Sequence, residues 1–261
     1  MMRAALGENK SEYTVLIGQS GCGKTNLIRN MISHALNTFT NDKIILVSQE
    51  NEYESFLKHM DSNSRFTFVD FDKTIGVGVT AYPGMPIDKH NIDSLFRSIC
   101  QMIKQNTKDG RKTWVYFDDL EYFIPNIDEE TQVIDLLEET NGLNAAYLFT
   151  AHRVNDLTWR QLYLLKHASF VLAMQMPTTS AEILANENVI PISYIEPITK
   201  LKIGEGYLFS EDEQIFKLAN EKYDCSIRSE VKLTPSKQFI HAEQQLNRLL
   251  GISFGGGING F

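Results

Sequence analysis

A glycine-rich run near the start of the chain has the residue types that hold a phosphate chain. It matches the pattern G-x-x-x-x-G-K-[ST] at every position, through Gly18, Gln19, Ser20, Gly21, Cys22, Gly23, Lys24 and Thr25. Glycines allow the backbone to curl so that successive N–H groups point at phosphate oxygens. In such loops the lysine reaches the β- and γ-phosphates, and the final hydroxyl binds Mg²⁺. The run therefore predicts a site for ATP and Mg²⁺, with Lys24 in a catalytic role and Thr25 as a metal ligand.

Acidic residues follow another apolar segment and would complete such a site. Residues 113–117 lead directly into Asp118 and Asp119, and Glu121 comes two positions after Asp119. One carboxylate at the end of a buried strand can hold the metal shell, and a neighbouring one can orient or deprotonate the attacking water. We assign Asp118 to the metal and Asp119 to the water, with Glu121 as the alternative. An acidic pair after a strand can also be a solvated turn, but a complete phosphate loop in the same chain favours the site.

His152 and Arg153 stand where a third element of the site is expected. They follow the apolar segment 145–150, which is the next strand after the acidic pair. A polar side chain at the tip of that strand can sense the γ-phosphate, so both residues are candidate catalytic groups. By itself, a His-Arg pair after a strand is an ordinary surface loop.

The elements that must position these groups alternate along the chain. Apolar segments typical of buried strands cover residues 13–17, 43–48, 65–70, 113–117, 145–150 and 169–174. Helical patterns cover residues 24–36, 51–60, 92–103, 128–140, 155–167, 180–188 and 192–201. Several glycines and prolines predict a loop over residues 71–91. Residues 206–209 and 214–218 are predicted to form a closing hairpin. The alternation predicts an α/β fold with a mainly parallel central sheet flanked by helices. Together with the phosphate-binding motif, it indicates a P-loop NTPase.

Composition sets limits on domain number and partners. The chain has 261 residues, of which 43% are hydrophobic, and we expect one ATPase domain over residues 1–220. Residues 221–261 are more polar and glycine-rich, and form either an arm that docks on a neighbour or a frayed terminus. The net charge of −8 gives no support for a nucleic-acid partner, but it leaves room for basic groups gathered in a narrow channel. The sequence predicts neither a signal peptide nor a membrane span.

Several motifs together resemble the FtsK–HerA superfamily of DNA-translocating ATPases, and most of all the genome-packaging ATPases of membrane-containing, double-jelly-roll icosahedral viruses. GQSGCGKT is similar to their Walker A motif and VYFDD to their Walker B motif. AYLFTAHRVNDL resembles the sensor stretch, and LKIGEGYLF a late element in which Gly-Glu precedes a strand. The resemblance covers about residues 13–218 in the right order. It implies a RecA-like core of the FtsK–HerA type.

The resemblance also implies a function and partners. We expect ATP-driven translocation of double-stranded DNA, with viral genome packaging into a preformed capsid as the leading form. The implied assembly is a homo-oligomeric ring, with a hexamer as the expected size, acting with capsid or membrane proteins at a packaging vertex. The implied location is the host cytoplasm, with the virion as a second place. Alternatives are a motor for conjugation, secretion or phage export, a small-molecule P-loop kinase, and a nucleotide-gated binding protein without useful turnover.

The chain departs from the family pattern at three positions. Asp119 replaces the usual second Walker B glutamate, and His152 replaces the sensor glutamine. Asn141 occupies the position where relatives often carry an arginine finger. Arg153, Arg160 or another arginine would then act in trans from the next subunit.

Two sets of basic residues are candidates for the DNA path. One lies in the loop 71–91 and comprises Lys73, Lys89 and His90. The other is the densest basic cluster of the chain and comprises Lys104, Lys108, Arg111 and Lys112. The second set can also be a solvated helix end, where positive charge is favourable.

Overall fold

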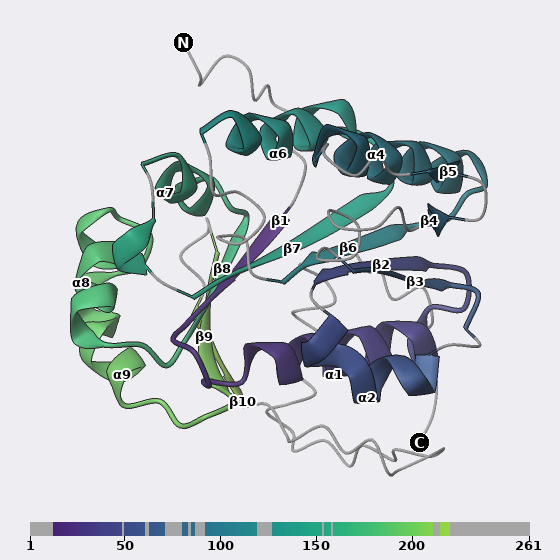
Figure 1. Cartoon of the computed structure of the whole chain (residues 1–261). Coiled ribbons are helices and arrows are strands. Elements are labelled where there is room, and N and C mark those ends of the chain that lie inside the picture. Colours follow the sequence, from purple (N-terminus) through teal and green to yellow (C-terminus); the bar gives the residue numbers. More distant parts are fainter. Residues whose placement is uncertain are drawn as a thin grey trace, which may run out of the picture.

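Strands and helices alternate in the computed structural model, which describes residues 13–48, 50–60, 63–70, 80–82, 85–86, 92–118, 127–152, 154–157, 159–210 and 215–219 (Figure 1). The strands are β1 (Tyr13–Ile17), β2 (Lys43–Ser48), β3 (Phe66–Asp70), β4 (Thr80–Tyr82), β5 (Met85–Pro86), β6 (Thr113–Phe117), β7 (Ala145–Ala151), β8 (Phe170–Met174), β9 (Glu205–Ser210) and β10 (Ile215–Ala219). The helices are α1 (Lys24–Thr38), α2 (Glu50–Met60), α4 (Ile92–Lys108), α6 (Ile127–Glu139), α7 (Trp159–Lys166), α8 (Thr178–Asn186) and α9 (Ile195–Thr199). Two 3₁₀ turns, η2 (Val154–Asp156) and η3 (Ile192–Tyr194), join some of them.

The described strands form a mainly parallel sheet, as the sequence predicts. Its order is β10-β9-β8-β1-β7-β6-β2-β3. The strands from β8 to β3 pair in parallel, whereas β9 and β10 add an antiparallel hairpin at one edge. The phosphate-loop strand β1 is thus central, with β7 and β8 on either side.

Helices cover both faces of this sheet because its strands are apolar on both faces. Val15 of β1 belongs to a core shared with α4, α6, α7, α8 and α9, while the adjacent Leu16 belongs to a core shared with α1 and α2. Figure 1 shows α4 and α6 above the sheet and α1 and α2 below it. Within the described part of the chain, no helix is both long and apolar enough to cross a bilayer.

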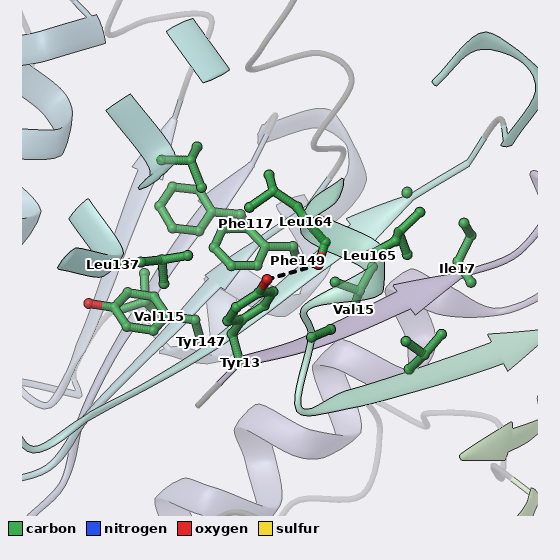
Figure 2. Close-up of a cluster of buried hydrophobic side chains, with 14 of the residues drawn as sticks. Tyr13, Val15, Ile17, Val115, Phe117, Leu137, Tyr147, Phe149, Leu164 and Leu165 are labelled. Carbon is green, nitrogen blue, oxygen red and sulfur yellow. Dashed lines mark hydrogen bonds between the residues drawn. The ribbon is translucent and has the colours of Figure 1, made fainter. Parts of the chain in front are cut away.

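Aromatic side chains fill the centre of the larger core (Figure 2). The Phe149 ring stacks on the Phe117 ring at a centroid distance of 5.2 Å and meets Tyr13 edge-on at 5.9 Å. The Tyr13 hydroxyl donates a hydrogen bond to the Leu164 carbonyl over 2.8 Å, which ties α7 to the sheet. These contacts hold β1, β6 and β7 in one register.

That register brings the carboxyl ends of four parallel strands to the same edge. Ile17 of β1 pairs with Ala151 of β7, and Phe117 of β6 pairs with Phe149 of β7. The Asp118 N–H continues the ladder by donating to the Val47 carbonyl of β2 over 3.0 Å. Asp118 and His152, which follow β6 and β7, therefore lie at the same edge of the sheet as the turn that follows β1.

The structure corrects two of the predicted elements. The helix predicted over residues 155–167 is divided into η2 and α7. The Ser180 hydroxyl donates to the Asn155 side-chain oxygen over 3.2 Å, so a contact with α8 fixes the turn that local periodicity missed. The loop predicted over residues 71–91 contains the antiparallel pair β4 and β5. The extension 221–261 lies outside the described residues.

We expect Phe149→Ala to lower the free energy of unfolding by about 3–5 kcal/mol, because it removes a fully packed ring and leaves a cavity. Urea unfolding followed by circular dichroism measures the change. Ile192→Ala is the matched control, because Ile192 is 73% exposed and its loss should cost less than about 0.5 kcal/mol. Equal effects of the two substitutions would contradict the described core.

Candidate functional site

The glycine-rich run forms the turn between β1 and α1. Gly21 and Gly23 have φ values of 78° and 105°, a region that residues with a side chain rarely adopt. Gly23 is the N-cap of α1, and no side chain caps that end of the helix. A helix N-terminus of this kind, with the positive end of the helix dipole, is where proteins commonly bind anions.

Lys24 places its ammonium group inside this turn. Its side chain is buried, and Nζ donates to the carbonyls of Gly18 over 2.6 Å and Gln19 over 3.1 Å. A buried cation needs such partners because isolated charge is costly away from water. The ammonium is thus held where the phosphates are expected.

Residues far along the chain brace the turn. The Gly204 N–H donates to the Cys22 carbonyl over 2.9 Å, and the Gln19 N–H donates to the Gln175 carbonyl over 2.9 Å. A Cβ on Gly23 would lie 3.3 Å from the Gly204 nitrogen, so the two segments pack backbone to backbone. The late Gly-Glu element singled out in the sequence therefore supports the phosphate turn directly. Burial raises the pKa of the Cys22 thiol, which disfavours the reactive thiolate.

Asp118 lies at the end of β6 with both carboxylate oxygens engaged. The Thr150 hydroxyl donates to Oδ1 and the Tyr53 hydroxyl donates to Oδ2, each over 2.7 Å. Burial raises the pKa of Asp118, although these two hydrogen bonds act in the opposite direction. The nearby Glu52 carboxylate raises this pKa further, and Lys24 lowers it.

The Thr25 hydroxyl and the Asp118 carboxylate carry oxygen atoms of the kind that Mg²⁺ binds in proteins. The hydroxyl of the half-buried Thr25 donates a hydrogen bond to Glu52 Oε2 over 3.1 Å. Asp118 interacts electrostatically with both Glu52 and Lys24. Among the described residues, no group of three or more His, Cys, Asp or Glu side chains could hold a metal by itself. The Thr25 hydroxyl and the Asp118 carboxylate fit Mg²⁺, which is usually held by one or two carboxylates together with substrate phosphates.

The remaining predicted site residues fall into two groups. His152 follows β7 directly and is half-buried at the same edge of the sheet as Asp118. Asp119, Glu121 and Arg153 lie outside the described residues, so their assignments stay predictions. Asn141 is exposed in the turn between α6 and β7, at the opposite edge of the sheet.

The densest basic cluster also lies at that opposite edge, where α4 ends and β6 begins. Lys104 forms an ion pair with Glu139 at 3.0 Å, and the Lys112 ammonium lies 4.2 Å from the centre of the Trp114 ring. Burial lowers the pKa of Lys43, and the charges of Arg111 and Arg65 lower it further, so both arginines lie near it. Lys43 and Arg65 therefore extend the cluster beyond what the sequence indicated. The residues Lys73, Lys89 and His90 lie outside the described part.

Tyr53, Thr150 and Glu52 are the site residues that sequence reasoning missed. Thr150 ends the apolar segment before His152, so its position after a central strand was an available signal. Tyr53 and Glu52 lie on α2, and no motif marks them. Only their place just after β2, the strand beside β6, brings them to the site.

Comparison with known proteins shows the fold. No protein-family model and no curated protein matches the sequence. The DNA-packaging ATPase B204 of Sulfolobus turreted icosahedral virus is similar in structure, with a TM-score of 0.59 and 16% identity over 82% of this chain and 99% of B204. VirB4 of Thermoanaerobacter pseudethanolicus gives a TM-score of 0.58 and 10% identity over 81% of this chain and 89% of VirB4.

A larger protein also contains the same fold. The cytoplasmic domain of the Thermomonospora curvata type VII secretion ATPase EccC gives a TM-score of 0.55 and 14% identity over 82% of this chain, which corresponds to 24% of the EccC chain. The chain thus has the fold that these ATPases share.

We expect Asp118→Asn to stabilise the metal-free protein increasingly as pH rises. Burial raises the pKa of Asp118 above its unfolded value, so between the two values the folded protein keeps a proton that the unfolded chain releases. Stability of the wild type then falls as pH rises through this window, and the uncharged amide removes that loss.

Urea unfolding in EDTA, over a pH series that starts near the ordinary Asp pKa of about 4 and rises to about pH 8, measures the difference between variant and wild type. Asp135→Asn, an exposed change on α6, is the control and should show no such trend. In nucleotide titrations the Asp118 variant should also lose the part of the affinity that depends on Mg²⁺. A pH-independent difference in stability would contradict a costly buried carboxylate.

Proposed function

We propose that this chain is an ATPase motor that translocates double-stranded DNA, and that its task is packaging a viral genome into a preformed capsid. The observation that carries the proposal is the juxtaposition of the Lys24 phosphate turn with Asp118 and Thr25 at one sheet edge. The similarity to B204, a DNA-packaging ATPase, extends over nearly all of that protein and supports the specific task. A related B204 has been solved with ATP-γS, which supports ATP as the nucleotide.

The residues at this edge have distinct roles in the proposed hydrolysis. The Lys24 ammonium and the N–H groups that open α1 hold the β- and γ-phosphates and offset the charge that develops on them. The Thr25 hydroxyl and the Asp118 carboxylate hold Mg²⁺. When bound, this ion reduces the charge of the phosphate oxygens. Tyr53 and Thr150 orient Asp118 by occupying one lone pair on each of its oxygens.

A ring of identical subunits is the proposed assembly, as the resemblance of the sequence motifs to the FtsK–HerA superfamily implies. An arginine of the next subunit, such as Arg153 or Arg160, would then reach the γ-phosphate. The basic cluster lies at the sheet edge away from the phosphate turn, so one subunit can contact nucleotide and DNA at separate places. Capsid or membrane proteins at a packaging vertex, in the host cytoplasm or virion, are the proposed docking partners.

A secretion motor is the second candidate function, since EccC is a type VII secretion ATPase with the same fold. Double-stranded DNA distinguishes the two candidates. A DNA motor should hydrolyse ATP faster when duplex DNA is present, whereas a protein-secretion motor should ignore it.

We expect Lys24→Ala to lower the ATP turnover rate by at least about 10²-fold, because it removes a positioned charge on the transferring phosphoryl group. Steady-state phosphate release measures the rate, and circular dichroism checks that the variant is folded. Lys58→Ala is the control, because Lys58 is exposed on α2 and pairs with Glu54 at 2.8 Å. Unchanged turnover in the Lys24 variant would rule out the proposed site.

We expect stimulation by duplex DNA to depend on the basic cluster. Replacing Lys104, Lys108, Arg111 and Lys112 together by glutamine should abolish stimulation and keep the basal rate. Binding should ignore sequence and weaken steeply with salt, with a log–log slope of about −0.9 for each phosphate neutralised. A triple glutamine variant of the exposed Lys58, Lys166 and Lys200 is the control. If the assembled wild type gives no stimulation at low salt, the DNA motor is wrong.

A further inference from the structure

No sequence motif marks helix α2 as part of the site. It begins at Glu50, just after β2, and β2 lies between β6 and β3 in the sheet. Its first turns therefore stand beside the carboxyl end of β6, where Asp118 is placed. Two adjacent residues of this helix, Glu52 and Tyr53, contact groups of the phosphate site.

Tyr53 fixes the rotation of α2 about its axis. Its side chain is fully buried, its hydroxyl donates to Asp118, and its ring meets Phe56 at a centroid distance of 6.2 Å. Burial and the Asp118 charge hold the pKa of Tyr53 well above its usual range, so the hydroxyl remains a donor. With Tyr53 pointing inward, the residue before it is held at the margin of the site.

Arg29 of α1 also holds α2 at Glu52 and Tyr53. Its Nη2 donates to the Glu52 carbonyl, and its guanidinium carbon lies 5.3 Å from the centre of the Tyr53 ring. The backbone of residue 52 is thus held by α1, the helix that also carries Lys24 and Thr25. Consequently the Glu52 side chain has a defined position relative to the phosphate turn.

The Glu52 carboxylate lies at the edge of the predicted metal shell. It accepts a hydrogen bond from the Thr25 hydroxyl over 3.1 Å. Because Thr25 is the donor, the lone pairs of its oxygen can still bind a cation. If Thr25 holds Mg²⁺, a carboxylate hydrogen-bonded to the Thr25 hydroxyl would stand beside the water molecules that this ion usually keeps. A general base must come within hydrogen-bond distance of the water that it activates.

Glu52 and Asp118 differ in what their oxygens can still do. Asp118 is buried, and both of its oxygens already accept hydrogen bonds from protein hydroxyls. Glu52 is exposed, so water can reach it. A buried carboxylate whose two oxygens both accept hydrogen bonds suits a fixed structural role, whereas an accessible carboxylate can accept a hydrogen bond from a water molecule.

We propose that Glu52 orients and deprotonates the water that attacks the γ-phosphate. The water oxygen forms a bond to γ-phosphorus while the bond from that phosphorus to the bridging oxygen breaks, and the bond's electron pair leaves with ADP. The water proton passes to the Glu52 carboxylate and then to solvent. This inference rests on the proposed ATPase function, and it gives to Glu52 the role that the sequence assigned to Asp119 or Glu121.

Glu52→Gln tests the role, because it keeps the length of the side chain and removes its basicity. We expect ATP turnover to fall by at least about 10²-fold, the usual contribution of a general base. Equilibrium titration with a fluorescent ATP analogue, in Mg²⁺ and in EDTA, should give affinities within about threefold of the wild type, since a base acts only in the chemical step. The unfolding midpoint should also stay unchanged, because Glu52 is exposed.

Glu54→Gln is the matched control, because Glu54 is exposed on the same helix and pairs only with Lys58 among the described ion pairs. It should turn over ATP at the wild-type rate. Tyr53→Phe is the positioning variant: it keeps the ring and removes the bond to Asp118, so it should weaken Mg²⁺-dependent binding, which Glu52→Gln leaves intact.

Three results would overturn the proposal. One is wild-type turnover in the Glu52 variant. Another is a parallel loss of Mg²⁺-dependent affinity, which would make Glu52 a metal ligand and not a base. The third is loss of turnover in Asp119→Asn or Glu121→Gln while Glu52→Gln stays active. A wild-type protein without any ATPase activity would instead refute the proposed function, so the two failures are distinguishable.

Discussion

The buried carboxylate of Asp118 is the interaction on which the rest of the site depends. A negative charge removed from water is stable only when hydrogen bonds and nearby positive charge compensate it. Here the two hydroxyls come from different elements, Thr150 from β7 and Tyr53 from α2, while Lys24 approaches from α1. Because the Asp118 carboxylate needs all of these partners, it connects β7, α2 and α1 around the phosphate turn.

The sheet makes that convergence possible. Parallel strands bring their carboxyl ends to one edge, and the stacked rings of Phe117 and Phe149 hold β6 and β7 in register beneath it. A shift of one residue in that register would send the aromatic rings to the opposite face and carry Thr150 away from Asp118. The apolar core and the polar site are thus set by the same strand alignment.

The phosphate turn and the basic cluster lie at opposite edges of the sheet. Lys24 lies at the carboxyl edge, whereas Lys43, Arg65, Arg111 and Lys112 gather near the amino ends of β2, β3 and β6. A chain with a net charge of −8 therefore still gathers basic residues at the edge away from its phosphate turn, where Asp109 and Glu139 lie among them. Whole-chain composition cannot show this grouping, because it counts charges and does not locate them.

The sequence alone determined the parts of the site that are local. The phosphate turn is one continuous segment, so its pattern predicted the turn between β1 and α1, and the apolar run before Asp118 predicted a buried strand ending in a carboxylate. The helix over 155–167 was wrong where Asn155 contacts Ser180, a contact between segments. Tyr53 is 65 residues from Asp118, Thr150 is 32 residues from it, and Glu52 is 27 residues from Thr25. Only the tertiary structure could bring these groups together, because hydrogen bonds between side chains depend on distance in space and leave no periodic pattern along the chain.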